Sequence, residues 1–443
     1  METERGGQVV TAVPWTVERV DGLAPDATSA KAGRAQAVAA KWSGAGASTE
    51  AVWGDCQGSG KKPYQTCVEL DGPAYRCTCP SRKFPCKHAL GVLFLWASGQ
   101  VAEAPTPGWV GEWLAERADR AQRAEKRTEA GPKDEEAAAK RAEERVHRVE
   151  GGAAELKAWL LDRVGAGFAG FEREGADELR GVAARMVDAQ ASGLAGVLRR
   201  AAGLVGRGRD WPGALLAELS MLYLLADACT RLGTLPADLA ETVRTRLGFT
   251  TETAKVLESG ERVADDWLIC GAADEENDRL FTRRTWLRGT RTGRDALVLS
   301  FAPLGRPLDS SLPPGHLLTA ELSYYPAAAP MRALVGERGI PVPAPGPAGD
   351  SIEQALAAYA QTLAADPWLE RWPMLLTGVT PAATDKGWCL SEKDGTALPL
   401  VATADPWRLL AVSAGMPVTV AAEWTSAGLR PLTCWHEDRA VRL

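Results

Sequence analysis

The chain has 443 residues, of which 45% are hydrophobic and 24% are charged, and its formal net charge at pH 7 is −6. These proportions are ordinary for a soluble globular protein, and the length predicts about three domains. The net negative charge argues against a general nucleic-acid binder, because the domains of such proteins are strongly basic.

The sequence predicts neither export nor a membrane span. Residues 1–5 are acidic and lack the basic and then apolar plan of a signal peptide. No stretch approaches the roughly eighteen uninterrupted apolar residues that a spanning helix needs. The nine cysteines, without an export signal, are expected to remain reduced thiols. We therefore expect a cytoplasmic protein that makes no membrane contact.

Residues 1–100 are expected to form a small zinc-stabilised domain of the ββα type with a helix before it. An alanine-rich segment predicts that helix over residues 26–41, and the glycines within residues 44–48 should break it. Residues 64–70 and 74–77 alternate like strands on either side of a turn, which predicts a hairpin.

Four candidate metal ligands lie between this hairpin and an apolar helix expected over residues 89–96. They are Cys77, Cys79, Cys86 and His88. Three thiolates and one imidazole complete a tetrahedral zinc shell and leave no position for a substrate water. Cys86 and His88 would lie at or just before the helix start, where free backbone N–H groups stabilise thiolate charge. The pattern predicts one structural zinc ion per chain.

The same residues allow other assignments. Buried thiols, a disulfide and a surface histidine would have the same composition, but Cys-x-Cys followed by Cys-x-His is a specific spacing. Cys56 and Cys67 could supplement the zinc site. We expect them to be spare thiols, because the shell of four ligands is already complete.

The order of hairpin, Cys-x-Cys, short spacer, Cys-x-His and apolar helix resembles the SWIM zinc finger over residues 50–97. Residues 53–64 are also similar to the lead-in of bacterial SWIM-family proteins. The resemblance implies that the four candidates are the zinc ligands and that the module contacts DNA or other proteins. Bacterial proteins similar to this one are often encoded beside MoxR-type AAA+ ATPases and von Willebrand A-domain proteins. An adaptor role with partners of those two classes is therefore implied.

A basic stretch surrounds the predicted zinc site. Residues 61–88 hold six basic and two acidic side chains, a local charge of +4. Arg82 and Lys83 lie in the spacer between the two ligand pairs, and Lys87 lies inside the second pair, so all three could contact a phosphate backbone. A solvated loop would explain the same residues. DNA binding through this loop is therefore the alternative to a protein adaptor.

Helical patterns follow the finger. Residues 101–150 are rich in interspersed Glu, Lys and Arg, with a Gly-Pro break at residues 131–132, which predicts a charged helical linker or a disordered tether. Residues 151–260 are expected to form a domain of five or six helices, because apolar residues recur at spacings of three and four. Within it, residues 215–228 are apolar nearly all round, which predicts a central helix.

Near residue 262 the periodicity changes to that of strands. Alternating segments between polar turns, with one helix over residues 351–364, predict an α+β or mostly β domain over residues 261–443, with a barrel as one arrangement. Eight tryptophans fall in this region, and we expect core packing more than a protein-binding face. The whole chain is thus expected to be an α+β multidomain protein.

No catalytic constellation is apparent in the sequence. Besides His88, the histidines are His147 in the charged linker, His316 in a loop, and His436 close to Cys434. A strand would place Cys434 and His436 on one face, but no oxyanion-binding motif lies nearby. We therefore expect a binding protein and not an enzyme, and an unrecognised active site in the C-terminal domain is the least favoured alternative.

Overall fold

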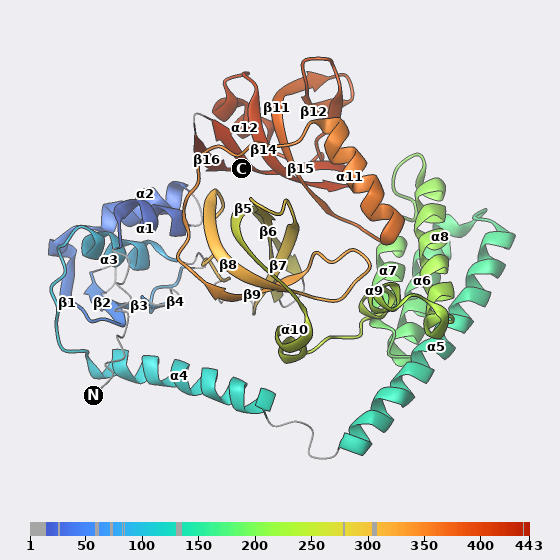
Figure 1. Cartoon of the computed structure of the whole chain (residues 1–443), viewed down its shortest axis with the longest axis horizontal. Coiled ribbons are helices and arrows are strands. Elements are labelled where there is room, and N and C mark those ends of the chain that lie inside the picture. Colours follow the sequence, from blue (N-terminus) through green and yellow to red (C-terminus); the bar gives the residue numbers. More distant parts are fainter. Residues whose placement is uncertain are drawn as a thin grey trace, which may run out of the picture.

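The computed structural model describes residues 15–24, 27–57, 62–70, 74–81, 83, 85–129, 135–277, 280–303, 308–436 and 438–443, with the backbone alone at residues 18, 27, 120–129, 135–139 and 277. Three parts follow one another along the chain (Figure 1): an N-terminal sheet with helices, a helical bundle, and a C-terminal part built on two sheets. This arrangement confirms the α+β multidomain architecture.

The N-terminal part is a four-stranded antiparallel sheet with helices packed on it. Its elements are α1 (Val17–Leu23), α2 (Ala27–Gln36), the 3₁₀ turn η1 (Ala39–Lys41), β1 (Trp42–Ala47), β2 (Ala51–Cys56), β3 (Tyr64–Glu69), β4 (Ala74–Cys77) and α3 (Lys87–Ala97). The strands pair in chain order, and β3 and β4 form the expected hairpin. The helix expected over residues 26–41 ends at Gln36.

The glycines near residue 44 do not simply end a helix, as the sequence predicted, but belong to strand β1. Packing explains why small residues are needed there. A Cβ at Gly46 would lie 2.8 Å from the Trp53 ring, and a Cβ at Gly54 would lie 2.9 Å from the Trp42 ring. The two tryptophans fill the space that larger side chains would occupy. Pairing with β2 then holds the glycine-rich strand despite its weak intrinsic preference.

The central strands of this sheet, β2 and β3, are buried on both faces. On one face, Val52 belongs to the same core as Leu90 of α3. On the other face, Trp53 packs in a cluster with Val110, which lies in the first turn of α4 (Gly108–Glu129). The sheet is therefore held between two layers of helix, which fixes the position of its β4 edge.

The helical part has one core formed by the inward faces of its helices. Its elements are α5 (Glu135–Ala166), α6 (Phe171–Asp188), α7 (Ser192–Ala202), α8 (Trp211–Cys229), the 3₁₀ turn η2 (Leu232–Thr234), α9 (Ala237–Leu247) and α10 (Thr253–Ser259). Helix α5 is 32 residues long and joins the core from Val149 onwards, so it runs from the charged region into the bundle without a break.

Helix α8 is less central than the sequence predicted. Leu219 and Leu222 are buried in the bundle core, but Leu216, Met221 and Leu224 are 41%, 36% and 40% exposed. The contacts of α8 with α5, α7 and α9 therefore cover only part of its circumference. Among the described residues, α8 is the one helix long and apolar enough to cross a membrane, and a core helix of a soluble protein meets the same test.

The first C-terminal sheet curls into a nearly closed barrel (Figure 1). It contains β5 (Glu261–Asn277), β6 (Leu280–Gly289), β7 (Asp295–Pro303), β8 (His316–Tyr324), β9 (Ala333–Arg338) and β10 (Val342–Pro343), in the order β10-β8-β5-β6-β7 with β9 also on β8. The Leu297 N–H of β7 donates to the Met331 carbonyl just before β9, at 2.7 Å. This contact brings β7 to β9 around a core that includes Trp267 and Leu322.

The second C-terminal sheet carries two helices on one face. It contains β11 (Trp372–Thr384), β12 (Gly387–Ser391), β13 (Ala397–Pro399), β14 (Val418–Thr425), β15 (Gly428–His436) and β16 (Arg439–Arg442), in the order β13-β12-β11-β14-β15-β16. The helices α11 (Ile352–Ala365) and α12 (Pro406–Ser413) supply Ile352 and Leu409 to its core. Helix α11 agrees with the expected 351–364, whereas α12, β9 and the short β10, β13 and β16 were not expected.

A buried ionic cluster joins the two sheets. The side chain of Arg284 on β6 is 8% exposed and donates from Nε to Glu423 of β14 at 2.9 Å. Trp286 Nε1 donates to the same carboxylate at 2.9 Å. Burial raises the pKa of Glu423, but the hydrogen bond and charge of Arg284 outweigh burial and lower it overall. The pair is therefore ionised and links β6 of the first sheet to β14 of the second.

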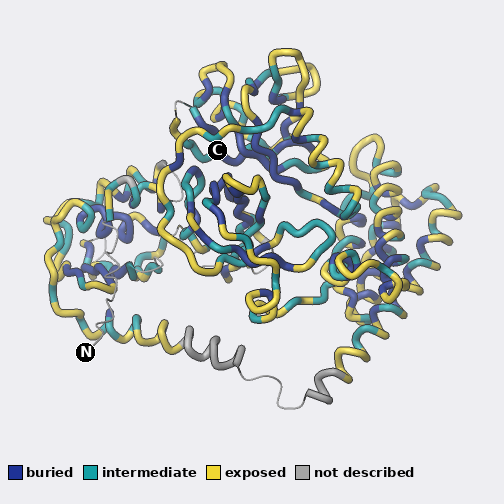
Figure 2. The backbone as a smooth tube through the Cα atoms, in the orientation of Figure 1, coloured by how far each residue is buried: buried dark blue, intermediate teal, exposed yellow. Residues whose placement is uncertain are grey.

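Side chains also connect the three parts. Trp368 Nε1 donates to the Met221 carbonyl of α8 at 3.1 Å, and the Tyr75 hydroxyl lies 3.5 Å from Ser310 Oγ. Figure 2 shows the buried segments concentrated in the sheets and on the inward sides of the bundle helices. Of the eight C-terminal tryptophans, most are buried or half-buried as expected, but Trp407 is 67% exposed.

Candidate metal centre

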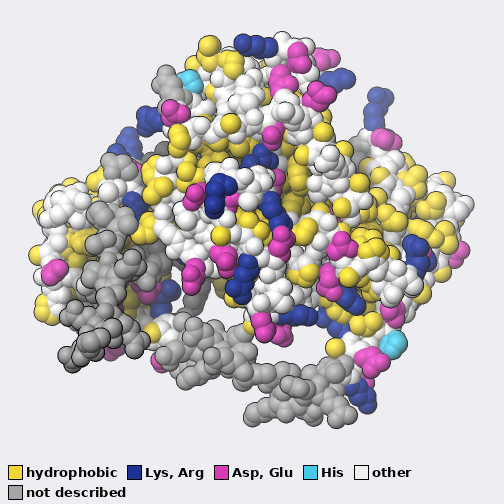
Figure 3. All heavy atoms as spheres, viewed as in Figure 1, with side chains coloured by type: hydrophobic (Ala, Val, Ile, Leu, Met, Phe, Trp, Pro, Cys, Tyr) yellow, Lys and Arg dark blue, Asp and Glu magenta, His cyan; other side chains and the backbone are white. Residues whose placement is uncertain are grey.

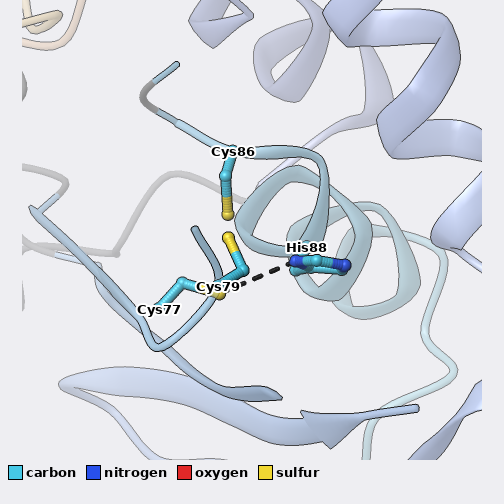
Figure 4. A group of neighbouring side chains, drawn as sticks. All are labelled: Cys77, Cys79, Cys86 and His88. Carbon is cyan, nitrogen blue, oxygen red and sulfur yellow. Dashed lines mark hydrogen bonds between the residues drawn. The ribbon is translucent and has the colours of Figure 1, made fainter. Parts of the chain in front are cut away.

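The four predicted ligands come from two neighbouring elements of the N-terminal part. Cys77 is the last residue of β4, and Cys79 follows it in the chain. Cys86 is the N-cap of α3, and His88 is the second residue of that helix. Because α3 packs on β3 and β4, the helix start lies beside the strand end. The side chains of all four residues point toward one another (Figure 4).

The spacing of these ligand atoms suits one metal ion. One ligand atom from each residue lies within 4.8 Å of all the others, and Cys77 Sγ is 3.7 Å from His88 Nδ1. Ligands at about 2.3 Å from a tetrahedral zinc ion would be separated by about 3.8 Å. Cys86 and His88 are buried, and Cys77 and Cys79 are half-buried. The cluster is thus positioned to bind one zinc ion.

The electrostatics of the three thiols favour a bound cation. A hydrogen bond with Cys86 lowers the pKa of Cys77, burial opposes this, and hydrogen bonds with His88 and Thr66 help to hold it at about 4. The hydrogen bond to Cys77 raises the pKa of Cys86, and burial raises the pKa of Cys79. The site therefore ionises one thiol and resists ionising the other two. A divalent cation supplies the charge that three adjacent thiolates need.

Three neighbouring groups support the ligands. Thr66 Oγ1 lies 3.2 Å from Cys77 Sγ, and the Ala89 N–H donates to Cys86 Sγ at 3.4 Å. The ring of Tyr64 lies on that of His88 with centroids 4.9 Å apart. Such contacts orient metal ligands and stabilise thiolate charge. Residue spacing does not reveal the Thr66 contact, which depends on the β3–β4 register that places Thr66 opposite Cys77.

Cys56 and Cys67 lie outside the ligand cluster of the described residues. Cys67 is on the opposite face of the sheet, in the cluster with Trp53, and burial raises the pKa of its thiol to about 12. The Cys56 thiol is 3.9 Å from Gln36 Oε1, and burial raises its pKa as well. Both are neutral thiols within the core.

The structure describes two of the three basic residues that were candidates for nucleic-acid contact. Arg82 lies outside the described residues. Lys83 is exposed in the spacer loop, where its backbone N–H donates to Ser81 Oγ at 3.2 Å. Lys87 is exposed at the first position of α3, between the buried ligands Cys86 and His88. The described lysines thus flank the metal centre on the solvent side.

Comparison with known protein families agrees with this geometry. Residues 67–96 match the SWIM zinc finger family. The chain contains a SWIM zinc finger. Residues 144–247 match the SWIM-associated four-helix bundle domain, which corresponds to the bundle from the first third of α5 to the end of α9. No curated protein and no solved structure matches the chain. The SWIM finger and the bundle associated with it therefore occur in the same chain.

Proposed function

We propose that this SWIM protein is a zinc-stabilised adaptor that acts by binding other macromolecules and not by catalysis. The observation that carries the proposal is the ligand set, because three cysteines and one histidine fill every position of a tetrahedral shell. Zinc held in this way stabilises a fold and offers no open position to a substrate. The finger then contributes a rigid surface to which a partner can bind.

The thiol and imidazole groups outside the finger support a non-catalytic role. Burial raises the pKa of the Cys434 thiol to about 11, which leaves it protonated and weakly nucleophilic at neutral pH. Burial lowers the pKa of His316, whose Nδ1 is 3.3 Å from the Pro314 carbonyl. Cys434 lies in the core of the second sheet, and His316 is the first residue of β8.

A protein partner is favoured over DNA by the distribution of charge. Basic and acidic side chains are interspersed over the bundle and the C-terminal part on the face in Figure 3. In the finger, the Arg76 guanidinium lies 5.9 Å from the Trp109 ring centroid and donates to the Trp109 carbonyl at 3.3 Å, so it links β4 to α4. We propose a cytoplasmic location and partners among MoxR-type AAA+ ATPases and von Willebrand A-domain proteins, because SWIM-family proteins are often encoded beside them.

The test measures binding of the purified full chain to an AAA+ ATPase and a von Willebrand A-domain protein from the same organism, by biolayer interferometry. Metal content is measured on the same sample. We expect about one zinc per chain and binding to at least one partner that is lost when a chelator removes the zinc. The charge reversal Lys83→Glu should weaken binding if the partner contacts the spacer loop, and Lys386→Glu on the exposed β11–β12 turn is the matched control.

DNA binding through the finger is the second candidate, favoured by the exposure of Lys83 and Lys87 beside the metal centre. Fluorescence anisotropy with duplex DNA across a salt series separates the two functions. A DNA-binding finger loses affinity steeply as salt rises, and a variant with Arg82→Ala and Lys83→Ala binds more weakly. Binding that ignores both salt and these substitutions excludes this function, and zinc content without DNA binding leaves the protein adaptor.

A further inference from the structure

Strand β7 is an outer strand of the barrel (Figure 1) and has a partner strand on one side only. It pairs with β6 from Asp295 to Pro303 without a register shift. On its other side, one parallel bridge joins Leu297 to Arg332, just before β9, and no ladder to β9 follows it in the described part of the chain. Residues 298–303 therefore form an unpaired strand edge, which we call the β7 edge.

One hydrogen bond shows which backbone groups point out of the β7 edge. The Leu297 N–H points away from β6, since it donates to the Met331 carbonyl at 2.7 Å. Along a strand in an antiparallel pair, the N–H and C=O groups of every second residue point to the same side. The N–H and C=O groups of Leu299 and Phe301 therefore also point away from β6, toward the gap between β7 and β9. Groups in this arrangement are the ones that bind an added strand.

Strand β7 lacks the features by which natural proteins protect an exposed strand edge. Such edges are usually very short, or they carry charged residues, prolines or bulges. The outer strands β10, β13 and β16 have two, three and four residues, whereas β7 has nine. After Asp295 the strand contains no charged residue, and its one proline, Pro303, is its last residue. An unprotected edge of this length is a ready template for a further strand.

The side chains beside the β7 edge are apolar and accessible. Phe301 is 53% exposed, and Leu280 on β6 is 38% exposed. Both lie on the outer face of the barrel, because Phe301 is opposite Thr282 and Leu280 is two residues before Thr282. Val298 of β7 and Val335 of β9 face the barrel core but are only half-buried. A strand added here would therefore place alternate side chains on Phe301 and over the two valines.

We propose that the β7 edge binds an extended, uncharged peptide segment of a partner protein, which pairs antiparallel with β7 and places an aromatic or β-branched side chain on Phe301. A single segment suits this edge better than a second copy of the chain does. Strand β9 runs in the same direction as β7 from the Leu297 bridge, so a second barrel would bring its own β9 into the same gap. The proposal goes beyond the adaptor function and does not depend on the zinc finger, because β7 lies outside both matched family regions. Failure to bind a peptide here would leave the zinc-dependent binding proposed above unaffected.

The test is isothermal titration of the full chain with acetyl-Lys-Thr-Val-Tyr-Val-Thr-Lys-amide, in which the terminal lysines keep an uncharged central segment soluble. The control peptide carries an N-methyl group on the tyrosine, which removes the N–H opposite Phe301 and keeps every side chain and charge. We expect the methylated peptide to bind about tenfold more weakly. Phe301→Ala should weaken the unmodified peptide about fivefold. Val342→Ala, at a residue that is also 53% exposed but lies on β10, should leave the affinity unchanged.

Substitutions at Leu299 test the same pairing from the side of the protein. Leu299→Pro removes an N–H that the pairing of β6 with β7 does not use, so the barrel should stay folded, as circular dichroism would show. Leu299→Ala is the matched control, since it shortens the side chain and keeps the N–H. We expect the proline variant to bind the peptide about fivefold more weakly than the alanine variant.

Equal affinities for the methylated and unmodified peptides, or a Phe301→Ala variant that binds as tightly as the natural chain, would overturn the proposal. Sedimentation of the protein without peptide tests the other occupant of the β7 edge. A dimer that Leu299→Pro dissociates would assign the edge to a second copy of the chain and overturn the peptide assignment.

Discussion

Replacing Thr66 by valine tests whether the finger tunes its metal ligands through a neighbouring hydroxyl. Thr66 is fully buried on β3, directly opposite Cys77, and its Oγ1 lies 3.2 Å from the Cys77 sulfur. Valine has a similar shape and is favoured in strands. The substitution therefore removes one hydrogen bond to a zinc ligand while it keeps the volume that packs beneath the metal centre.

The expected loss in zinc affinity is about 10–100-fold, as is typical when a partner of a metal ligand is removed. This factor corresponds to about 1.4–2.7 kcal/mol at 25 °C. The structure gives the direction of the change in zinc affinity, because the hydrogen bond with the Thr66 hydroxyl is one of the contacts that lower the pKa of Cys77. Without it the thiol holds its proton more tightly, and zinc must displace that proton to bind.

The assay is competition for zinc against a chromophoric chelator, with circular dichroism to confirm that the variant is folded. Thr66→Ser is the matched control, since it keeps the hydroxyl and loses one methyl group. We expect the serine variant to retain most of the affinity that the valine variant loses. A valine variant within twofold of the natural chain, or a serine variant as weak as the valine variant, would refute a role for the hydroxyl.

The other predictions concern stability. Cys79→Ala should abolish zinc binding and unfold the finger, because structural zinc contributes on the order of 10 kcal/mol; an unchanged circular dichroism spectrum with zinc still bound would contradict this. Glu423→Gln should destabilise the C-terminal part by about 1.5–3 kcal/mol in urea unfolding, since it removes one charged hydrogen-bond partner of Arg284 while Glu275 still pairs with that guanidinium, and an unchanged midpoint would count against it. Burial raises the pKa of Asp265, but hydrogen bonds from Thr292 and its neighbours outweigh burial and hold it at about 2. The stability from this lowered pKa is present above about pH 4 and lost as the pH falls toward about 2, so Asp265→Asn should flatten the acid side of a stability profile, and a profile as steep as that of the natural chain would argue otherwise.

The zinc ligands could be predicted because the information that defines them is local. Cys77 and His88 are eleven positions apart, and a hairpin followed by a helix start brings such close residues together in few ways. Helix α11 and most strands of the C-terminal part could be predicted for the same reason, because periodicity is a property of short segments. Strand β1 could not be predicted in this way. Gly46 lies there because the ring of Trp53 leaves no room for a side chain, and glycine has no preference of its own for a strand.

The sequence by itself determined the ligand set, the class of each segment and the net charge, since these depend on residue type and on spacings of a few positions. Tertiary structure alone decided which groups support the ligands, as with Thr66 beneath Cys77 through the strand register. It also decided that the Arg288 guanidinium on β6 donates to the carboxylate of Asp350, 62 positions further along the chain. Contacts of this kind depend on how elements pack against one another, and residue spacing carries no record of that packing.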